Sequence, residues 1–140
     1  MPIPPDLAWQ LSDQLGHAYS VVLSVARREL AGEPLSPAEV VALVILTGFP
    51  DGLTQTSWGE YQGVSRQRAH TIGNKLTNAG LTEVTRAGRA SAVTLTRAGR
   101  ALVVRVQPRT SAALAEALGG LTAAEARELS RLLSKLTDAK

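Results

Sequence analysis

Hydrophobic residues recur at spacings of three and four between residues 5 and 31, a pattern that predicts a long helix. The recurring positions are Leu7, Leu11, Leu15, Ala18, Val22 and Ala26. Further apolar residues stand between them, at Tyr19, Leu23, Val25 and Leu30. Because these positions cover more of the helix surface than one contact requires, we expect either the core or a second subunit to cover this helix.

The segment LSPAEVVALVIL contains a clear start signal for a second helix. Ser36 can cap this helix, Pro37 occupies its first position and Glu39 completes a capping box. Residues 40–46 are apolar on every side, which predicts a central and buried helix. The glycine and the proline of the following GFP end it.

A short third helix is expected over about residues 55–62, where Thr54 is suited to act as its cap. This helix would bury Trp58 and either Tyr61 or Val64.

Gly63 supplies a turn after the third helix, and Ser65 then caps a fourth helix over residues 66–79. Gly80 ends the fourth helix, as expected for a residue in the left-handed region. The two helices and the turn between them predict a helix-turn-helix.

The helix over residues 66–79 has a small apolar face and a large polar one. Ala69, Ile72, Leu76 and Ala79 share the inward face. The opposite face carries Gln67, Asn74 and Asn78, flanked by His70 and Thr71, with Arg66, Arg68 and Lys75 at its edges. Amide side chains can pair with adenine, arginine with guanine, and edge cations with phosphates. This distribution favours a helix that enters the DNA major groove; a face that is merely solvated is the alternative.

After this helix the hydrophobic period changes to that of strands. The segment LTEVTRAGRASAVTLT predicts two short strands joined by a basic turn. A basic hairpin directly behind a helix-turn-helix is typical of a winged helix. Its Arg86 and Arg89 could reach an adjacent minor groove, whose negative potential attracts arginine.

Two helices complete the predicted order of elements. Thr96 caps a helix over residues 97–118, which we expect to break or bend near Pro108. After two glycines, LTAAEARELSRLLSKL predicts a last helix with its own capping box, formed by Thr122 and Glu125.

Composition and charge narrow the class of protein. The 140 residues suit one domain, and with only five aromatic residues the core must be mostly Leu, Val, Ala and Ile, which favours packed helices. The net charge of +3 is unevenly distributed, because residues 66–109 hold nine basic side chains and one acidic, a net +8 that leaves −5 for the remainder. A basic middle between acidic ends favours an anionic partner; a solvated basic face is the alternative.

Several classes of protein are disfavoured by what the sequence lacks. It has no cysteine, which excludes disulfides and thiolate zinc sites and fits a reducing cytoplasm. It has no apolar run of about 18 residues and no signal peptide, so we expect a cytoplasmic protein without a membrane span. It has no phosphate loop, dinucleotide fingerprint or nucleophile motif, so we expect neither an enzyme nor a cofactor. Asp13 and His17 lie four residues apart, but two ligands are too few, so we expect a surface or interface pair and no metal site.

Three segments resemble, in order and spacing, the MarR family of bacterial winged-helix regulators. They are LSPAEVVALVIL, LTQTSWGEYQGVSRQRAHTIGNKLTNAGL and VTLTRAGRALV, and the resemblance covers about residues 35–137. It implies a mainly α fold in a single MarR-like domain over residues 1–140, with a winged helix-turn-helix over 35–96 that has a short β-hairpin wing. It also implies dimerisation helices over 5–31 and 97–137, because members of the family are homodimers that bind pseudo-palindromic operators.

The resemblance further implies roles for individual residues. Ser65, Gln67, Arg68 and Thr71 fall on positions of the recognition helix that meet DNA in the family, and Arg89 matches the arginine at the wing tip. Together with the polar helix face, the predicted DNA-binding residues are Ser65, Arg66, Gln67, Arg68, His70, Thr71, Asn74, Lys75, Arg86 and Arg89. The family often senses small aromatic compounds in a cleft that Trp9, His17 and Tyr19 could line, whereas Trp58 replaces a usual core leucine and is expected to pack.

The sequence departs from the family pattern at three places. The wing is shorter, with Ala87 where the family has an aspartate, and Thr71 stands where an arginine is common. Gly73 lies inside the recognition helix, at a cost of roughly 1 kcal/mol relative to alanine unless close packing requires it. The favoured prediction is a DNA-binding transcriptional repressor, a homodimer on a pseudo-palindromic operator that a small aromatic effector releases. The alternative is a winged-helix protein-interaction or ligand-sensing module with degenerate DNA binding.

Overall fold

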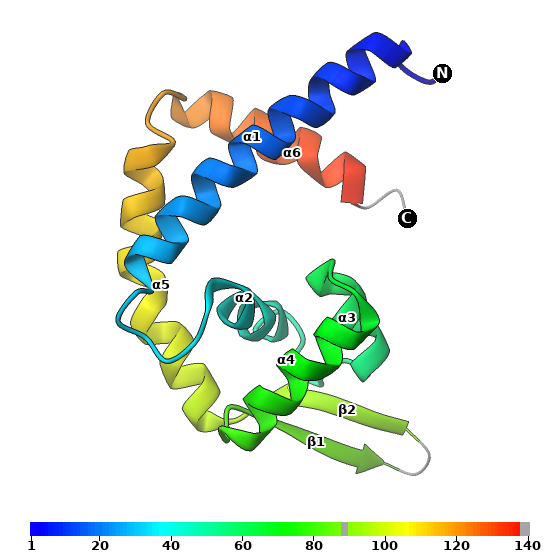
Figure 1. The fold of residues 1–140 in the computed structure, drawn as a ribbon, viewed down its shortest axis with the longest axis vertical. Helices are drawn as coiled ribbons and strands as arrows, with labels where there is room; N and C mark the ends of the chain where they lie inside the picture. Colours follow the sequence, from blue (N-terminus) through cyan, green and yellow to red (C-terminus); the bar gives the residue numbers. More distant parts are fainter. Residues whose placement is uncertain (88–89, 138–140) are drawn as a thin grey trace.

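The computed structural model describes residues 1–87 and 90–137, and within them it contains six helices and one two-stranded antiparallel sheet (Figure 1). In chain order the elements are α1 (Pro5–Glu29), α2 (Pro37–Leu46), α3 (Gln55–Gln62), α4 (Arg66–Asn78), β1 (Thr82–Ala87), β2 (Ala90–Leu95), α5 (Arg97–Ala117) and α6 (Ala123–Thr137). The predicted fold class is confirmed: the chain is mainly α, with a helix-turn-helix followed by a hairpin wing.

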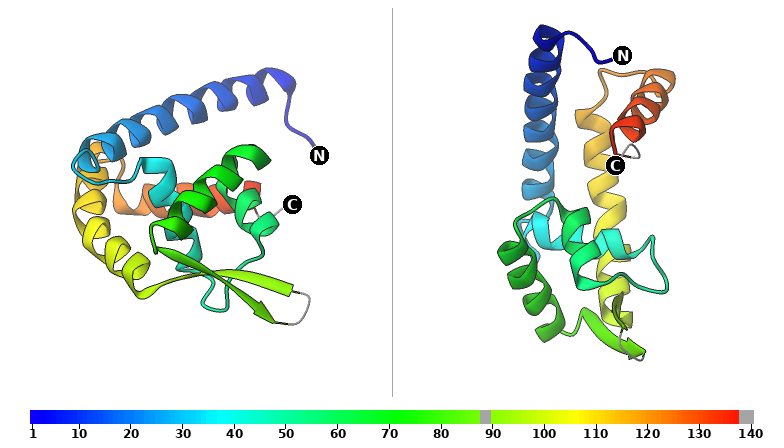
Figure 2. Two further views of the ribbon diagram at one scale, coloured as in Figure 1. Left: turned by 60° about the horizontal axis from the view of Figure 1, so that its bottom comes forward. Right: turned by 90° about the vertical axis from the view of Figure 1, so that its right-hand side faces the viewer.

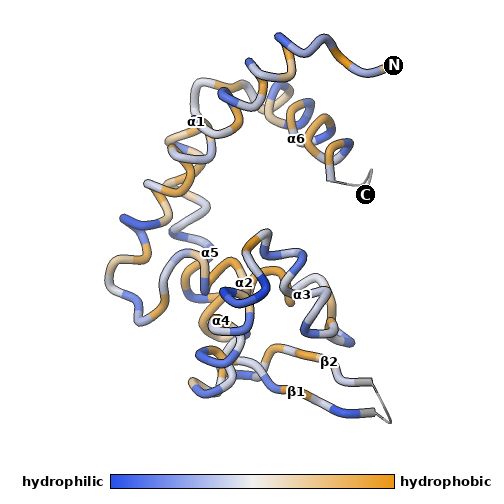
Figure 3. Tube along the Cα trace, turned by 45° about the vertical axis from the view of Figure 1, so that its right-hand side comes forward, coloured by the Kyte–Doolittle hydropathy of each residue, from blue (hydrophilic) through white to orange (hydrophobic). Residues whose placement is uncertain are grey.

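The elements form two parts (Figures 1 and 2). The helices α2, α3 and α4 pack with the hairpin into a winged helix, while α1, the second half of α5 and α6 extend away from it. α1 and α5 run side by side, whereas α6 buries no residue against its own chain. Hydrophobic residues nevertheless recur along α1 and α6 as well as in the winged helix (Figure 3). The extended part therefore carries apolar surface that the single chain leaves exposed.

The helices begin at the residues that the sequence predicts. The N-cap side chains of Thr54, Ser65 and Thr96 each accept a hydrogen bond, at 3.1 Å, from the backbone N–H three residues further on. At the start of α2 the backbone N–H of Ser36 donates to Glu39 Oε1 at 2.8 Å, and the N–H of Glu39 donates to Ser36 Oγ at 3.3 Å. A second capping box of the same kind starts α6. Such caps satisfy helix N–H groups that would otherwise lack a partner.

The wing is anchored to the core at its base. β1 and β2 pair along their length, with Val84 opposite the buried Val93. Val93 also exchanges two backbone hydrogen bonds with Leu53, in the loop before α3. Gly52 makes this approach possible, because its φ is 88° and a Cβ there would lie 2.8 Å from the Val93 carbonyl oxygen.

The prediction that α2 is buried on every side is wrong for one face. Ala42, Leu43 and Leu46 are buried, but the side chains of Val41 and Val44 are 51% and 40% exposed. The helix packs against α3, α4, α5 and β2, and no element in the described part of the chain covers the face that bears these two valines. An all-apolar helix does not require a complete cover within one subunit.

The break or bend that was expected near Pro108 is not a break: α5 is helical from Arg97 to Ala117. The helix curves gently along its course (Figure 1). A proline at 108 lacks the N–H that would bond the carbonyl of Val104. Since Val104 is exposed, water can satisfy that carbonyl without interrupting the helix.

Two smaller predictions about burial are corrected. Ala79 was placed on the inward face of α4, but it is exposed because it follows the last helical residue and the chain turns at Gly80, where φ is 76°. Of the two candidates to accompany Trp58, Tyr61 is exposed and its ring contacts that of Phe49 in a tilted arrangement, at a centroid distance of 5.1 Å, while Val64 is half-buried. Trp58 itself is 3% exposed, as the packing interpretation requires.

Candidate DNA-binding surface

Helix α4 is held on the core by few side chains and presents a wide polar surface. Ile72 and Leu76 are its only buried residues. The side chains predicted to face outward from this helix are all exposed: Arg66, Gln67, Arg68, His70, Thr71, Asn74, Lys75 and Asn78. The helix period thus correctly predicted the exposed positions of α4, and this face contains no acidic residue.

Two hydroxyl groups on this surface already have backbone partners. Ser65 Oγ accepts from the backbone N–H of Arg68 at 3.1 Å, and Thr71 Oγ1 donates to the carbonyl oxygen of Gln67 at 3.1 Å. The hydroxyl proton of Ser65 is still available for a hydrogen bond, whereas that of Thr71 is already donated to the Gln67 carbonyl. Thr71 therefore offers a partner only acceptor capacity and its methyl group.

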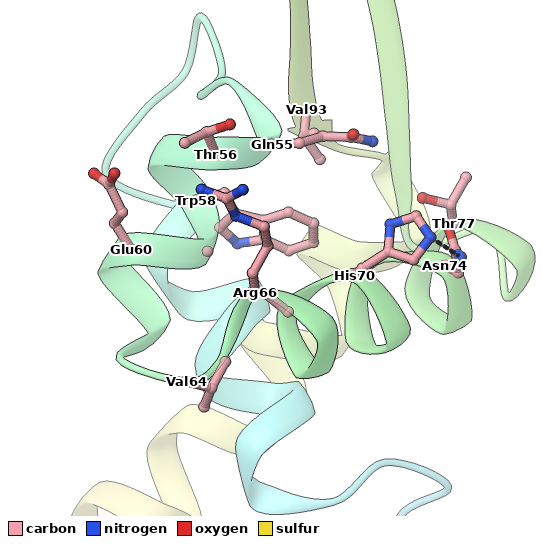
Figure 4. Close-up of a pocket in the computed structure, with 13 residues that line it drawn as sticks. Gln55, Thr56, Trp58, Glu60, Val64, Arg66, His70, Asn74, Thr77 and Val93 are labelled. Atoms are coloured by element: carbon pink, nitrogen blue, oxygen red, sulfur yellow. Dashed lines mark hydrogen bonds between the residues drawn. The ribbon is translucent and has the colours of Figure 1, made fainter.

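His70 and Asn74 form a pair on the same face of α4 (Figure 4). Asn74 Nδ2 lies 3.1 Å from His70 Nε2, one turn apart along the helix. With the amide in this orientation, Nδ2 donates to a neutral imidazole and Asn74 Oδ1 stays free to accept. The pair restricts the rotamers of two side chains that are predicted to contact DNA.

Lys75 differs from the other cations of α4 because it is bound to an acidic side chain. Its Nζ lies 2.9 Å from both carboxylate oxygens of Glu39, at the start of α2. Burial raises the pKa of Glu39, but hydrogen bonds from the backbone of Ser36 and from Lys75 outweigh that effect and leave the pKa below its ordinary value. The sequence identified Glu39 only as part of a cap, since a partner 36 residues away has no local signal.

Two further cations from the basic middle of the chain are also paired internally. Arg105 and Arg109, on α5, donate to the two carboxylate oxygens of Glu33 at 2.7 and 3.0 Å. The hydrogen bond from Arg105 is the main reason why the pKa of Glu33 lies below its ordinary value. The charge excess of residues 66–109 is consequently smaller at the surface than the sequence indicates.

Five arginines of the basic middle take part in no ion pair within residues 1–87 and 90–137. They are Arg66, Arg68, Arg86, Arg97 and Arg100. Arg86 lies on β1, opposite Ser91 of β2, and its side chain is exposed at the wing. Arg89, the predicted wing-tip residue, lies outside the described residues.

A hollow of about 380 Å³ lies between α3, α4 and β2 (Figure 4). Its lining includes His70 and Asn74 from α4, and the indole of Trp58, whose Nε1 donates to the carbonyl oxygen of Ala42 at 2.8 Å. Gly73 also lines it, and a Cβ at that position would lie 3.3 Å from the Trp58 ring. Close packing against Trp58 therefore accounts for a glycine inside the recognition helix.

The predicted effector-binding residues do not converge within one chain. Trp9 and His17 line a shallow groove along α1 together with Asp13 and three small residues, while Tyr19 is exposed outside that lining. Trp58 belongs to the hollow behind α4. Among the described residues no three His, Cys, Asp or Glu side chains come together as metal ligands, and no helix has the length and apolarity for a membrane crossing.

Solved structures match this chain along most of its length. A MarR family protein of Mycobacterium tuberculosis, solved with salicylic acid, is 32% identical, covers 90% of this chain and 95% of its own, and superposes with a TM-score of 0.73. The chain belongs to the MarR family. A structure of a Mycobacterium tuberculosis MarR family protein with DNA is 33% identical over 90% of this chain and 96% of its own, with a TM-score of 0.69.

A more distant MarR family member supports the fold alone. This transcriptional regulator from Rhodococcus is 18% identical, covers 98% of the present chain and 99% of its own, and has a TM-score of 0.85. No protein-family model and no curated protein matches the sequence. The Mycobacterium tuberculosis and Rhodococcus structures are those of MarR family proteins, and the Rhodococcus protein is a transcriptional regulator.

Proposed function

We propose that this MarR family chain is a transcriptional regulator that binds operator DNA in a sequence-dependent manner and represses transcription. We also propose that it is located in the cytoplasm. The observation that carries the proposal is the exposed face of α4, which presents amides and cations and no acidic residue. Amide side chains and arginine are suited to base edges in the major groove, and the edge cations to phosphates. The similar Mycobacterium tuberculosis protein that was solved with DNA supports the same partner.

Ten residues are proposed to form the DNA-binding surface. They are Ser65, Arg66, Gln67, Arg68, His70, Thr71, Asn74 and Lys75 around α4, and Arg86 and Arg89 of the wing. In this arrangement the α4 residues contact the major groove, and the wing arginines approach the neighbouring minor groove. Most of the affinity would come from phosphate neutralisation and would fall steeply with salt.

The acting species is proposed to be a homodimer formed through the helical extensions over residues 5–31 and 97–137. α6 has no buried residue although Leu129, Leu132, Leu133 and Leu136 recur along it. The first four turns of α1 are likewise exposed, with Leu7, Leu11 and Leu15 among them. A second copy that covers both helices would remove this apolar surface from water and would place two α4 helices on successive major grooves, about 34 Å apart.

Sedimentation equilibrium tests the dimer. Leu132→Glu should weaken self-association by roughly 30-fold or more, because a charge would replace an apolar side chain in the proposed interface. Tyr61→Ser, at an exposed aromatic residue of the winged helix, is the control and should leave the association unchanged. A wild-type chain that stays monomeric at high concentration would remove the proposed interface.

A small aromatic effector is proposed to act on the dimer, by analogy with the Mycobacterium tuberculosis relative that was solved with salicylic acid. Trp9, His17 and Tyr19 are the candidate contacts, and since they do not converge in one chain they require a cleft that the second subunit completes. Titration of the protein with salicylate, followed by tryptophan fluorescence, tests this site. A response that Trp9→Phe does not alter would exclude Trp9 from it.

Sequence-dependent DNA binding is tested with two duplexes of equal length, one from the DNA upstream of the gene and one a scrambled version. Operators of such regulators often lie beside their own genes, so the upstream duplex is the natural probe. Titration at two salt concentrations should show a preference for the upstream duplex that persists at the higher salt. Binding to neither duplex would favour the alternative, a winged-helix interaction module, which the internal pairing of Lys75, Arg105 and Arg109 also favours.

A further inference from the structure

The ion pair between Glu39 and Lys75 joins the ends of two helices that are distant in sequence. Glu39 lies in the first turn of α2 and Lys75 in the last turn of α4. Each charge complements the dipole of its own helix, because a carboxylate is favoured at a helix N-terminus and a cation near a C-terminus. The pair therefore links the positive end of α2 to the negative end of the recognition helix.

The two partners are held with unequal strength. The Glu39 side chain is 10% exposed, and its Oε1 accepts from the Ser36 backbone N–H at 2.8 Å as well as from Lys75. The Lys75 side chain is 52% exposed, and Glu39 is its sole ion-pair partner among the described residues. The carboxylate of Glu39 is thus held in place within α2, whereas the side chain of Lys75 extends from α4 to reach it.

The rest of α4 provides few directional contacts that would set its orientation. Its buried side chains are Ile72 and Leu76, and the hydrophobic contacts that they make are non-directional. The ion pair adds a charge-assisted link between one point of α4 and the start of α2, because Lys75 Nζ lies 2.9 Å from both carboxylate oxygens of Glu39. Small displacements of the helix matter, since hydrogen bonds to base edges require donor–acceptor distances within a few tenths of an ångström.

We propose that Glu39 and Lys75 are positioning residues that orient the recognition helix for base contacts, and that Lys75 is not a phosphate ligand. This inference rests on the proposed DNA-binding function and replaces the role assigned to Lys75 there. It also assigns a role in DNA recognition to Glu39, a residue that lies outside the helix-turn-helix. The remaining cations of α4 then supply the phosphate contacts of that helix.

The two roles of Lys75 predict opposite effects of Glu39→Gln. If the pair positions α4, its loss lowers the affinity for the preferred duplex, by about tenfold, and lowers it less for a scrambled duplex. If Lys75 binds phosphate, removal of Glu39 frees the ammonium group from a competing anion and raises the affinity for both duplexes. The sign of the change in dissociation constant separates the two.

The experiment measures dissociation constants of the intact protein for both duplexes over a range of salt concentrations. The variants are Glu39→Gln, Lys75→Met and Lys75→Arg. Lys140→Met, at a position outside the proposed dimerisation helices, is the control for the loss of one positive charge. Lys75→Met should reduce the preference about tenfold, with a salt slope equal to that of the control. Lys75→Arg should restore most of the preference, because it keeps a cation within reach of Glu39.

Three outcomes would overturn the inference. One is a gain in affinity with Glu39→Gln, and another is a salt slope that falls by about one for Lys75→Met but not for Lys140→Met. The third is an unchanged preference in every variant. If Glu39→Gln does not fold, as judged by circular dichroism, the two Lys75 variants still carry the test. A wild-type protein that prefers neither duplex would instead contradict the proposed function itself.

Discussion

The six-membered edge of the Trp58 indole stands 3.3 Å from the position that a Cβ on Gly73 would occupy. Trp58 cannot turn away freely, because it is buried and its Nε1 donates to the Ala42 carbonyl at 2.8 Å. The large side chain of Trp58 on α3 therefore fills the space that the absence of a side chain at Gly73 leaves on α4. Gly73 lowers the intrinsic helix propensity of α4, but it also allows α4 to pack closely against α3.

Gly73→Ala should consequently bring no stabilisation in the wild-type protein. Alanine is favoured over glycine inside a helix by roughly 1 kcal/mol, but here the new methyl group presses on the Trp58 ring. In a Trp58→Leu background the contact is gone, and the same substitution should raise the free energy of unfolding by about 1 kcal/mol. Urea denaturation of the four proteins at one protein concentration measures this double-mutant cycle. An equal gain in both backgrounds would show that Trp58 does not constrain Gly73.

Gly99 should be far less tolerant of substitution than Gly73. A Cβ on Gly99, in the first turn of α5, would overlap the carbonyl oxygen of Leu81, a contact with backbone that no rotamer change can relieve. Gly99→Ala should lower the free energy of unfolding by about 2–4 kcal/mol. Gly120→Ala is the control, because no other atom lies within 4 Å of the new methyl group, and its effect should be near zero. Similar thermal midpoints for the two variants would contradict the close approach at Leu81.

The starts and ends of the helices could be predicted from the sequence because the interactions responsible are local. The capping box of Ser36 and Glu39 spans three residues, and Gly80 ends α4 through its own left-handed backbone conformation. The exposed face of α4 could also be predicted from the sequence, since the apolar Ile72 and Leu76 determine which side of the helix faces the core.

The partners of the charged residues could not be predicted in the same way. Lys75 and Glu39 are separated by 36 residues, and Arg105 and Glu33 by 72, so no spacing rule applies to either pair. Counting charges along the chain treated all the cations as equally free. The exposure of Val41 was missed for a related reason, because the cover of an apolar helix face depends on how distant elements pack.

The stability of the protein should decrease in acid because the carboxylates of Glu33 and Glu39 become protonated. The pKa values of Glu33 and Glu39 lie below the ordinary value of 4.5, so both groups favour the folded state while they are ionised. Their contribution is complete above about pH 5 and is lost as the pH falls through their depressed pKa values. The free energy of unfolding of the wild type, measured by urea denaturation, should therefore fall below about pH 4.5.

The double variant Glu33→Gln/Glu39→Gln should be less stable than the wild type near neutral pH and should lose less stability on acidification. Some dependence will remain, since the pKa values of Glu125 and Glu128 are also lowered. Parallel curves for the two proteins would mean that neither ion pair contributes to the acid response.

Base contacts and phosphate contacts should respond differently to substitution of the residues around α4 and the wing. Gln67→Ala and Arg68→Ala should each weaken binding to the preferred duplex by about 1–3 kcal/mol and change binding to a scrambled duplex much less. Arg86→Ala, on β1, should weaken binding to both duplexes and reduce the salt slope by about one, as loss of a phosphate contact requires. Fluorescence anisotropy at several salt concentrations measures both quantities, with Lys140→Ala, at a position outside the proposed dimerisation helices, as the charge control. Equal losses on both duplexes for Gln67→Ala would assign that residue to the backbone of the DNA, and an unchanged slope for Arg86→Ala would place the wing away from the phosphates.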